Sequence, residues 1–323
     1  MNDLNYHILK LPLPLRLAHV QSFLIQGPKG YALIDTGIGS ATGQDELTQA
    51  LCQHQVRPQE IRELFVTHYH GDHWGQAGWL SEMGTRVIMS RIDDDFLQRW
   101  FERTDYEEIN LAYYTKQGAP PELAQASLKA LKWLRTLSPY FKATDLVDDG
   151  DEIMLAGLLF QVILTPGHSP GHACLEHAAT GTIFVGDHVL PHITPNISVE
   201  PGTLADPLSA YRSSLKRLLH RGYSLALPAH GPIIRNLDER IHEILEHHIE
   251  REGLLLAAMS KTPQSCFALS QALFDFKRLD AWESWMAMGE TLAHLRALES
   301  AGRVFSHQDS DGEKFSRLLG TTS

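Results

Sequence analysis

Short apolar runs that end in a polar or glycine-containing segment recur along much of the chain. Their short length and their content of β-branched and aromatic residues predict buried strands. The five clearest runs are YALIDTG (31–37), LFVTH (64–68), FQVILTPGH (160–168), TIFVGDH (182–188) and SLALPAH (224–230). The last four place His or Asp at the end of the apolar part, so a rigid sheet would hold these side chains at its strand tips, as active sites commonly do.

Helical periodicity appears between these runs. The segment 205–222 has apolar residues at helical spacing, with Asp206 as a candidate N-cap, Pro207 in the first turn and Gly222 at the expected end. Strands that alternate with helices predict an α/β layered core.

Residues 91–145 have a different pattern, because they are helix-forming, rich in aromatic residues and interrupted by GAPP. They predict two or three helices inserted between strands of the sheet. One interpretation is a packing or dimerisation element, and the other is a wall or lid that offers aromatic rings to an apolar substrate. The rings concerned are those of Trp100, Tyr106, Tyr113, Tyr114 and Trp133. Aromatic residues at helical spacing more often belong to a core.

The tail, residues 241–323, predicts three helices and a hairpin. The helices are expected over 238–259, over 262–275 with Thr262 and Pro263 at the start, and over 289–304 with its end at Gly302; the hairpin is expected around Asp311–Gly312. This order suggests a small winged-helix-like unit.

The third helix of the tail would enter the groove in a DNA-binding version of such a unit. It carries Glu290 and Glu299 against a single Arg296, and the tail has eight Lys or Arg against twelve Asp or Glu. Without a basic face the phosphate attraction that dominates nucleic-acid affinity is missing. We therefore expect a packing or dimerisation role and no nucleic-acid partner.

Composition narrows the class of protein. With 323 residues, 43% hydrophobic and 21% charged, the chain is typical of a soluble globular protein with one large domain or two. The net charge of −11 argues against a broad polyanion-binding surface. The first residues lack the basic and continuous apolar regions of a signal peptide, and no run is long enough to span a membrane. Three widely separated cysteines fit a reduced compartment, so we expect a cytoplasmic protein.

The segment THYHGDH (67–73) concentrates four metal-ligand side chains in six positions. In an extended segment, residues two apart project to the same side, so His68 and His70 can bind one ion. Asp72 and His73 can bind a second ion if a helix begins there, with Gly71 easing the bend. Zinc accepts imidazole nitrogen and carboxylate oxygen, and these residues form two incomplete sites. The missing ligands are expected at other strand tips, from His168, Asp187 and His230.

THYHGDH resembles the T-H-x-H-x-D-H signature of the metallo-β-lactamase superfamily. TPGHSPGH, FVGDH and PAHGP follow in the order and approximate spacing of that superfamily, so the resemblance covers about residues 15–235. It implies an α/β fold, a four-layer αβ/βα sandwich over residues 1–240 with a helical insertion at about 91–145. The tail, 241–323, resembles the winged-helix extension of a subgroup of these hydrolases.

The resemblance also implies a set of ligands for two divalent metal ions. His68, His70 and His168 look like the ligands of metal one, and Asp72, His73 and His230 look like those of metal two, with Asp187 similar to the bridging carboxylate. Zinc is the expected metal, although iron or manganese accepts the same donors. Asp72 would also act in catalysis by orienting the nucleophile and carrying its proton.

Further residues are expected around the ligands. His168 rather than His172 matches the ligand of the superfamily, which leaves His172 as a support of the ligands, a part of the pocket wall or a hydrogen-bonded structural residue. Asp35 matches a position near the metals in relatives, and it would orient a ligating His; the alternative is a simple turn aspartate. The neighbours of the ligands are expected to line the pocket or to pack: Tyr69, Trp74, His188 and His192.

The implied activity is hydrolysis of a small ester, thioester or lactone by a hydroxide that bridges the two metals. Metallo-β-lactamases of the common zinc class place Cys at a second-metal position, whereas Asp187 offers oxygen here, so β-lactams are not the expected substrate. Two alternatives stay open: a phosphodiesterase or endoribonuclease of the winged-helix-tailed branch, and an inactive binding relative or one that handles oxygen or electrons. The diiron branch has Glu where this chain has His70. The expected partner is a small-molecule substrate, and homodimerisation through the apolar faces of insertion and tail stays open.

Overall fold

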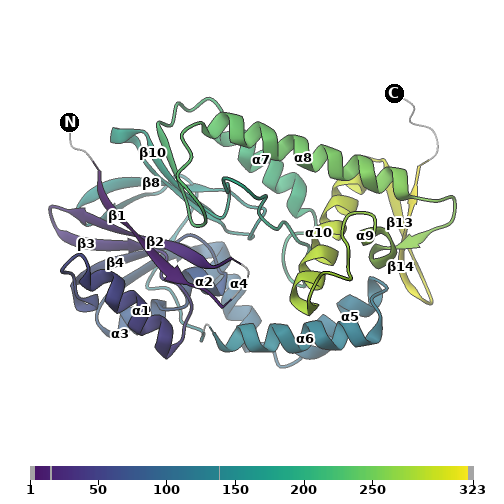
Figure 1. Ribbon diagram of the computed structural model, residues 1–323, viewed down its shortest axis with the longest axis horizontal. Coiled ribbons are helices and arrows are strands. Elements are labelled where there is room, and N and C mark those ends of the chain that lie inside the picture. Colours follow the sequence, from purple (N-terminus) through teal and green to yellow (C-terminus); the bar gives the residue numbers. More distant parts are fainter. Residues whose placement is uncertain (1–3, 15–16, 138, 319–323) are drawn as a thin grey trace. The chain divides into compact units, whose positions relative to one another are not determined.

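The structure is a computed structural model that describes residues 4–14, 17–137 and 139–318 (Figure 1). Its contacts divide the chain into two compact units. The first unit contains the described residues up to Glu102, then Leu134–Pro195 and Ser214–Ile241. The second contains Arg103–Trp133, Asn196–Ser213 and the described residues from His242 onward. The sequence patterns place a single boundary near residue 240, so the structure differs in giving two earlier segments to the second unit.

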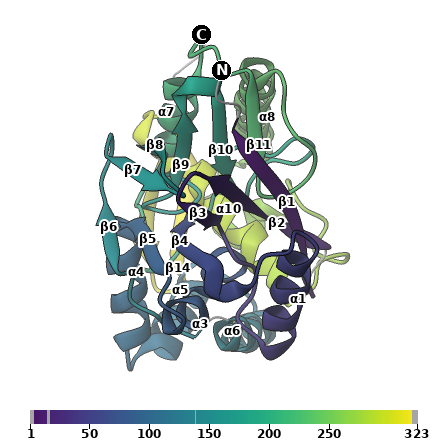
Figure 2. The ribbon, with the colours of Figure 1, turned by 90° about the vertical axis from the view of Figure 1, so that its left-hand side faces the viewer.

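The first unit contains a six-stranded sheet in the order β1-β2-β3-β4-β5-β6 (Figure 2). Its strands are β1 (Asn5–Pro12), β2 (His19–Gly27), β3 (Gly30–Ile34), β4 (Ile61–Val66), β5 (Arg86–Ser90) and β6 (Asp145–Val147). The pairs β1–β2 and β2–β3 are antiparallel, and β3 to β6 are parallel neighbours. The carboxyl ends of β3 and β4 therefore lie at the same edge, with Ile34 opposite Phe65.

A five-stranded sheet, in the order β11-β10-β9-β8-β7, completes the framework of this unit. Its strands are β7 (Glu152–Leu155), β8 (Leu158–Leu164), β9 (Ala173–His177), β10 (Thr182–Gly186) and β11 (Leu225–Pro228). Only β10 and β11 pair in parallel, while β7–β8, β8–β9 and β9–β10 are antiparallel. It follows that β8, β10 and β11 all run in the same direction and end at the same edge.

Successive residues of β2, β3 and β4 alternate between two separate cores. Phe23, Ile34 and Phe65 pack in one core with residues of the second sheet, such as Phe160 and Phe184. The residues between them face the other core, which consists largely of helix residues and the outer side of the first sheet: Leu24, Leu33, Leu64 and Val66. Because both faces are buried there, these strands carry consecutive apolar side chains over residues 23–25, 32–34 and 64–66. This arrangement confirms the predicted strands and the α/β sandwich.

The helices of the first unit pack on the outer face of the six-stranded sheet or follow one of its strands in the chain. They are α1 (Ala41–Cys52), α2 (Gly71–Trp74), α3 (Ala77–Glu82) and α4 (Arg91–Glu102), with short 3₁₀ turns at Pro58–Glu60 and Ala178–Thr180. Leu47 and Leu51 of α1 and Leu80 of α3 are fully buried in the outer core. The helix α7 (Pro207–Leu218) is shared, since its residues up to Ser213 belong to the second unit and the rest to the first. It begins at the predicted proline, and Asp206 Oδ1 accepts from the Ser209 N–H at 3.1 Å. It ends at Leu218, before the predicted Gly222.

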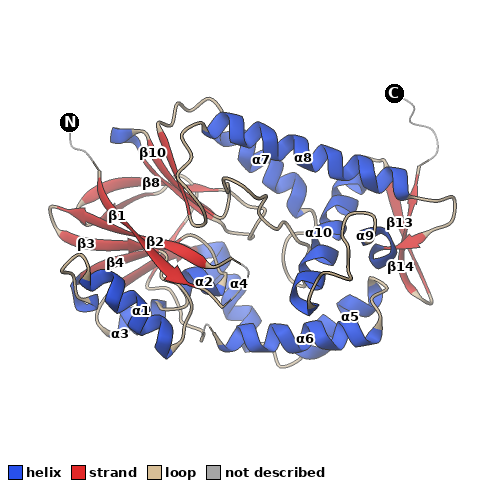
Figure 3. Ribbon diagram, viewed as in Figure 1, coloured by secondary structure: helices blue, strands red, loops and turns tan. Residues whose placement is uncertain are grey.

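The second unit combines part of the insertion with the tail (Figure 3). Its elements are α5 (Tyr106–Lys116), most of α6 (Pro121–Thr136) and of α8 (Leu237–Ala258), β12 (Gln264–Ser265), α9 (Cys266–Ser270), α10 (Ala281–Ser300), β13 (Val304–Asp309) and β14 (Gly312–Arg317). The three strands form an antiparallel sheet in the order β12-β14-β13. With α4, the insertion holds three helices between β5 and β6, as predicted.

Insertion aromatics form part of the core of the second unit. Tyr114 is fully buried and packs with Trp285 and Met288 of α10. Tyr113 belongs to the same cluster, and its hydroxyl donates to the Val199 carbonyl at 2.5 Å. These long-range contacts explain why the insertion joins the tail, and they favour the packing interpretation for these rings. Trp133, by contrast, is 46% exposed.

Two predicted helix starts in the tail are wrong. Residues 264 and 265 pair with β14 as a short strand, so α9 begins only at Cys266, with the Ser265 side chain accepting from Ala268 N–H. The helix α10 begins at Ala281, because Asp280 and Glu283 form a reciprocal capping box ahead of the apolar stretch. The hairpin is confirmed, with Asp309 opposite Gly312 and a two-residue turn between them. No helix among the described residues is long and apolar enough to cross a membrane.

We expect Phe184→Ala to lower the free energy of unfolding by about 3–5 kcal/mol, because it removes a ring from the core between the sheets. Phe184 is fully buried, and its ring meets those of Tyr6, Phe23 and Phe160. Leu159→Ala in the same sheet is the control, since Leu159 is 52% exposed and its loss should cost under about 1 kcal/mol. Urea unfolding followed by circular dichroism measures both, and equal losses would contradict this account of the core.

Candidate metal centre

Backbone hydrogen bonds hold the strand tips of the two sheets together. The Asp35 N–H, just after β3, donates to the Phe65 carbonyl at 2.9 Å. The Ala173 N–H donates to the Thr67 carbonyl at 2.9 Å, which joins the second sheet to the end of β4. The Ala229 N–H, after β11, donates to the Gly186 carbonyl at the end of β10, also at 2.9 Å. The segments that carry the predicted ligands are therefore fixed at one edge by main-chain bonds.

Three imidazoles from two loops form the first ligand group. His68 Nε2 lies 3.0 Å from His70 Nδ1, as expected for residues two apart in an extended segment. His168 lies in the loop after β8. Its ring centroid is 4.8 Å from the ring centroid of His68 and 4.5 Å from that of His70. One nitrogen from each of the three lies within 4.8 Å of the others, close enough to share an ion.

A carboxylate and two imidazoles form the second ligand group. Asp72 and His73 lie on α2, which begins at Gly71, so the helix on which a second ion site was conditional is present. Asp72 Oδ2 lies 3.5 Å from His73 Nε2 and 3.5 Å from His230 Nε2, which follows β11. The helical turn thus directs this pair away from His68 and His70 and toward a separate position.

Asp187 lies between the two groups. Its Oδ2 is 3.5 Å from His168 Nε2 of the first group and 3.6 Å from His73 Nε2 of the second. Its Oδ1 is 3.5 Å from His230 Nε2. One carboxylate is therefore within reach of ions held by either group.

Both the missing hydrogen-bond partners of the donor atoms and the distances between these atoms fit a metal centre. His73 Nε2, His230 Nε2 and Asp187 Oδ1 are buried, yet they make no hydrogen bond of ordinary geometry with any described residue. Buried polar atoms are rarely left in that state without a ligand or water. Ligand atoms about 2.1 Å from a tetrahedral ion lie about 3.4 Å apart, close to the 3.5 and 3.6 Å separations found here.

The electrostatics of the site also suit cations. Burial, followed by the charge that neighbouring imidazoles would carry, lowers the pKa of His68 well below its usual value and that of His70 to about 3. Both rings are therefore neutral and carry lone pairs. Burial also lowers the pKa of His230, but Asp187 and Asp72 outweigh it and raise that pKa to about 9. The carboxylates that hold a proton there would hold a cation in its place.

Asp35 fixes the orientation of His73. Its Oδ2 accepts from His73 Nδ1 at 2.8 Å, which leaves the Nε2 lone pair of that ring directed at Asp72 and Asp187. Its Oδ1 accepts from the Thr67 N–H at 2.8 Å. Asp35 has a φ of +59°, a left-handed conformation that costs a residue other than glycine about 1–3 kcal/mol. The predicted orienting role requires this contact with His73, which a simple turn aspartate would not make.

His172 is engaged at both ring nitrogens. Its Nε2 accepts from the Asp187 N–H at 3.2 Å, so the proton lies on Nδ1 and is donated to Thr165 Oγ1 at 2.8 Å. The ring therefore supports the backbone of Asp187. This geometry favours His168 over His172 as the ligand.

The other predicted neighbours differ in their surroundings. The ring of Tyr69 packs against those of His70 and Phe96, with ring centroids 4.7 Å and 4.5 Å apart, respectively. Trp74 is buried against Phe101 and Tyr140, which favours packing over substrate contact. His188 is fully buried, and burial lowers its pKa to about 3, so it is a neutral ring behind the ligands. His192 is exposed, unlike the buried cluster.

Sequence reasoning missed Thr67 and Asp93. The Thr67 hydroxyl lies 2.8 Å from Asp35 Oδ2 and 3.0 Å from His68 Nδ1, linking the supports of both groups. The buried Asp93 carboxylate accepts from the Tyr69 N–H, within the His68–His70 segment. Thr67 stands beside the motif and could have been noticed. Asp93 is one of three consecutive aspartates, and the sequence of this segment does not indicate which of the three side chains are buried.

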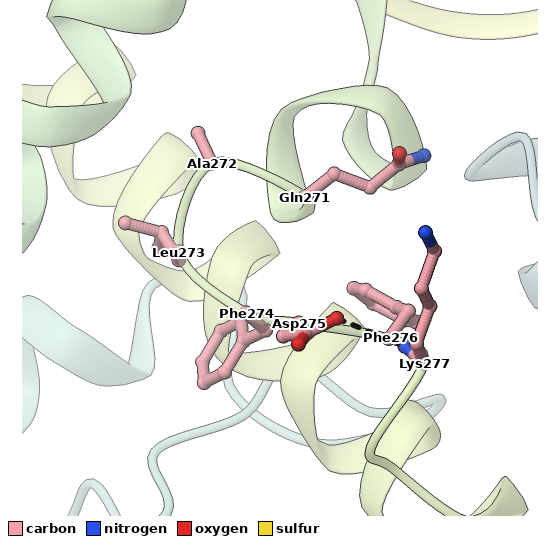
Figure 4. A pocket seen from close by; sticks show the side chains of 7 residues that line it. All are labelled: Gln271, Ala272, Leu273, Phe274, Asp275, Phe276 and Lys277. Atoms are coloured by element: carbon pink, nitrogen blue, oxygen red, sulfur yellow. Dashed lines mark hydrogen bonds between the residues drawn. The ribbon is translucent and has the colours of Figure 1, made fainter.

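A hollow elsewhere holds none of these residues. The segment Gln271–Lys277 of the second unit curves around a shallow depression of about 410 Å³ (Figure 4). It is lined by the apolar Ala272, Leu273, Phe274 and Phe276 and by the polar Gln271, Asp275 and Lys277. Such a depression, formed by one loop, has no converging ligand groups.

A family model described as "Metallo-beta-lactamase superfamily" matches residues 15–230, which is more than half of the chain. The chain belongs to the metallo-β-lactamase superfamily. A second model, "Metallo-beta-lactamase-like, C-terminal domain", matches residues 253–317. These matches confirm the resemblance and the prediction that the chain is an enzyme from a superfamily of metallo-hydrolases.

Similarity extends over nearly the whole chain. The protein named "Probable metallo-hydrolase YqjP" of Bacillus subtilis is 24% identical over 318 residues, covering 96% of this chain and 97% of that protein. A metallo-β-lactamase family protein of Thermus thermophilus, TTHA1429, superposes with a TM-score of 0.85 at 28% identity, covering 97% of this chain and 98% of that one. A β-lactamase domain protein of Burkholderia ambifaria gives 0.84 at 28% identity, covering 97% and 92%.

We expect removal of divalent metal by a chelator to lower the melting temperature, because metal that binds only the folded site adds to its stability. At a free metal concentration 1,000 times the Kd the stabilisation is about 4 kcal/mol. Differential scanning calorimetry of metal-loaded and stripped protein measures this difference. Asp35→Asn should show a smaller difference, and identical melting curves for loaded and stripped wild type would contradict the metal centre.

Proposed function

We propose that the chain is a two-metal hydrolase that cleaves a small ester, thioester or lactone. The observation that carries this proposal is the position of Asp187, whose carboxylate reaches nitrogens of both ligand groups. A single-ion site would need only one of these groups. Imidazole and carboxylate donors support zinc, and the same donors accept iron or manganese.

When bound, such ions act as Lewis acids and lower the pKa of a coordinated water toward neutrality. The chain's own residues supply the rest. His68, His70 and His168 would bind through their imidazole nitrogens, while Asp35 keeps His73 Nε2 directed at the site. The Asp72 side chain is 20% exposed, compared with 0% for His73 and 5% for His230. Its carboxylate is thus the member of the second group best placed to accept a proton from the nucleophile and release it to the leaving group.

The donor set supports ester-type substrates over β-lactams. The metal-ligand groups found among the described residues consist of His and Asp alone. All three cysteines are free, and Cys174, the one nearest in sequence to a ligand, is buried with its thiol beside Thr165. Free thiols also support a reduced, cytoplasmic location.

The second unit supports a winged-helix-like extension without a nucleic-acid role. The order α8, β12, α9, α10, β13, β14 is that of three helices with a three-stranded sheet. The helix α10 is largely buried, and its Arg296 is paired with Glu299 at 2.8 Å and with both Glu313 oxygens at 2.7 Å. A helix in this state offers a nucleic-acid groove little surface and no unpaired Arg. We therefore rank phosphodiester cleavage second.

Asp187→Asn should reduce the bound metal from two ions toward one while leaving the fold intact, because an amide bridges two cations less well than a carboxylate. Mass spectrometry under native conditions and circular dichroism measure the two effects. Asp148→Asn, at an exposed carboxylate of the same unit, is the control. Unchanged two-metal stoichiometry in Asp187→Asn would contradict the bridging role.

A hydrolysis panel with metal-loaded protein tests the substrate class. We expect turnover within the set of acyl-CoA and glutathione thioesters, homoserine lactones and aryl esters. Asp72→Asn should lower kcat/KM by about 10²–10⁴-fold, as expected for loss of a general acid or base. Bis(p-nitrophenyl) phosphate and single-stranded RNA complete the panel, and turnover of these two alone would overturn the proposal in favour of a phosphodiesterase.

A further inference from the structure

A buried carboxylate outside the seven predicted ligands connects the two loops of the first ligand group. Asp93 lies in the first turn of α4, directly after β5, and is fully buried. Its Oδ2 accepts from the Tyr69 N–H at 3.1 Å and from the Ser169 hydroxyl at 2.6 Å. Its Oδ1 accepts from the Gly171 N–H at 2.6 Å.

Two of the three donors are adjacent to predicted ligands in sequence, and the third, Gly171, lies in the same loop as His168. Tyr69 stands between His68 and His70, and Ser169 follows His168. The loops after β4 and β8 are about 100 residues apart, and the imidazoles of the first group come from these two loops. A shift of either loop would change the distances between the three nitrogens.

The packing at Gly171 shows how tightly the carboxylate is enclosed. A Cβ at this position would lie 2.4 Å from Ser90 Oγ, 2.7 Å from Asp93 N and 2.8 Å from Asp93 Oδ1. Only glycine allows the backbone of this loop to approach the helix start so closely. Ser90 Oγ in turn accepts from the Asp93 N–H at 3.2 Å, which fixes the residue that carries the carboxylate.

The charge on Asp93 is stabilised by these donors. Burial raises the pKa of Asp93 to about 7, against the lowering effect of the hydrogen bonds from Ser169, Gly171 and Tyr69. A buried acid that served only to cap α4 would not need donors from two distant loops. Asparagine could not replace it, because its one acceptor oxygen cannot satisfy donors on both sides of the group.

We propose that Asp93 is a positioning residue for the first metal: it holds the His68–His70 segment and the His168 loop at the separation that three imidazoles need to share one ion. This inference rests on the proposed two-metal function. Supporting groups of this kind typically contribute 10–100-fold to metal affinity.

The neighbouring aspartate supplies a matched control. Asp94 has the same side chain, lies on the same helix turn and is 1% exposed. Its Oδ1 accepts from the Ala143 N–H at 2.9 Å, and Ala143 is adjacent to no predicted ligand. Asp93→Asn and Asp94→Asn thus make the same side-chain change at equally buried positions.

The experiment measures zinc affinity of the first group alone. His230→Ala removes a member of the second group, and competition with a chromogenic chelator then reports the remaining ion. In this background, Asp93→Asn should weaken zinc binding about 10–100-fold, whereas Asp94→Asn should leave it within about twofold. Equal affinities for the two variants would overturn the inference while leaving the proposed function intact. Wild-type protein that binds no metal would overturn both.

If circular dichroism shows that Asp93→Asn does not fold, a milder variant tests the positioning role. Ser169→Ala removes one donor and keeps the carboxylate, so we expect a loss of zinc affinity of about three- to tenfold in the same background. The visible spectrum of bound Co²⁺ provides a second measurement, because a displaced imidazole changes it even when the ion stays bound. Unchanged affinity and spectrum in Ser169→Ala would overturn the positioning role.

Discussion

The structure depends on a concentration of buried polar groups that is unfavourable without cations. Five imidazoles and two carboxylates from four segments of the chain meet within a few ångströms, and most are removed from water. Burying ionised groups costs several kcal/mol for each ion unless opposite charge lies nearby. Protons on His73 and His230 offset part of this cost, as the raised pKa values of both residues indicate. Divalent cations offset more, because they bring two charges each and accept the nitrogen lone pairs as well.

The two sheets make this concentration feasible. Strands β3 and β4 end at one edge of the first sheet, and β8, β10 and β11 run in one direction in the second. Five separate tips therefore converge while the apolar residues behind them fill the core between the sheets. The left-handed backbone of Asp35 is tolerated for the same reason, since the rigid sheet and the hydrogen bonds that Asp35 makes with Phe65, Ser22, Thr67 and His73 hold it in place.

Residues that carry a periodic or local signal could be predicted from the sequence. The strands that are apolar on both faces and the His68–His73 motif belong to this class, because period, length and spacing are local properties. The burial of Asp93 and Tyr114 depends on contacts with residues about 75 to 175 positions away, which no local pattern contains. The start of α9 was missed for a related reason, since Gln264 pairs with the distant Phe315. The substrate is the least predictable feature, because the seven proposed ligands indicate a reaction type and leave the chemistry of the leaving group open.

Each part of the metal centre has a separate support that does not itself bind metal. Asp35 orients His73 of the second group, His172 holds the backbone of Asp187, the proposed bridging carboxylate, and Asp93 connects the loops of the first group. All three are fully buried or nearly so, and each bonds to main chain or hydroxyl groups of the sheet tips. The ligand positions are therefore fixed by the folded chain before any ion arrives, which lowers the reorganisation that binding requires. Asp72 contacts His73 and His230, and it is the more exposed of the two carboxylates, at 20% against 10% for Asp187. The site thus combines rigid ligands with one more accessible acid, the combination that a hydrolase needs to hold its ions still while it moves a proton.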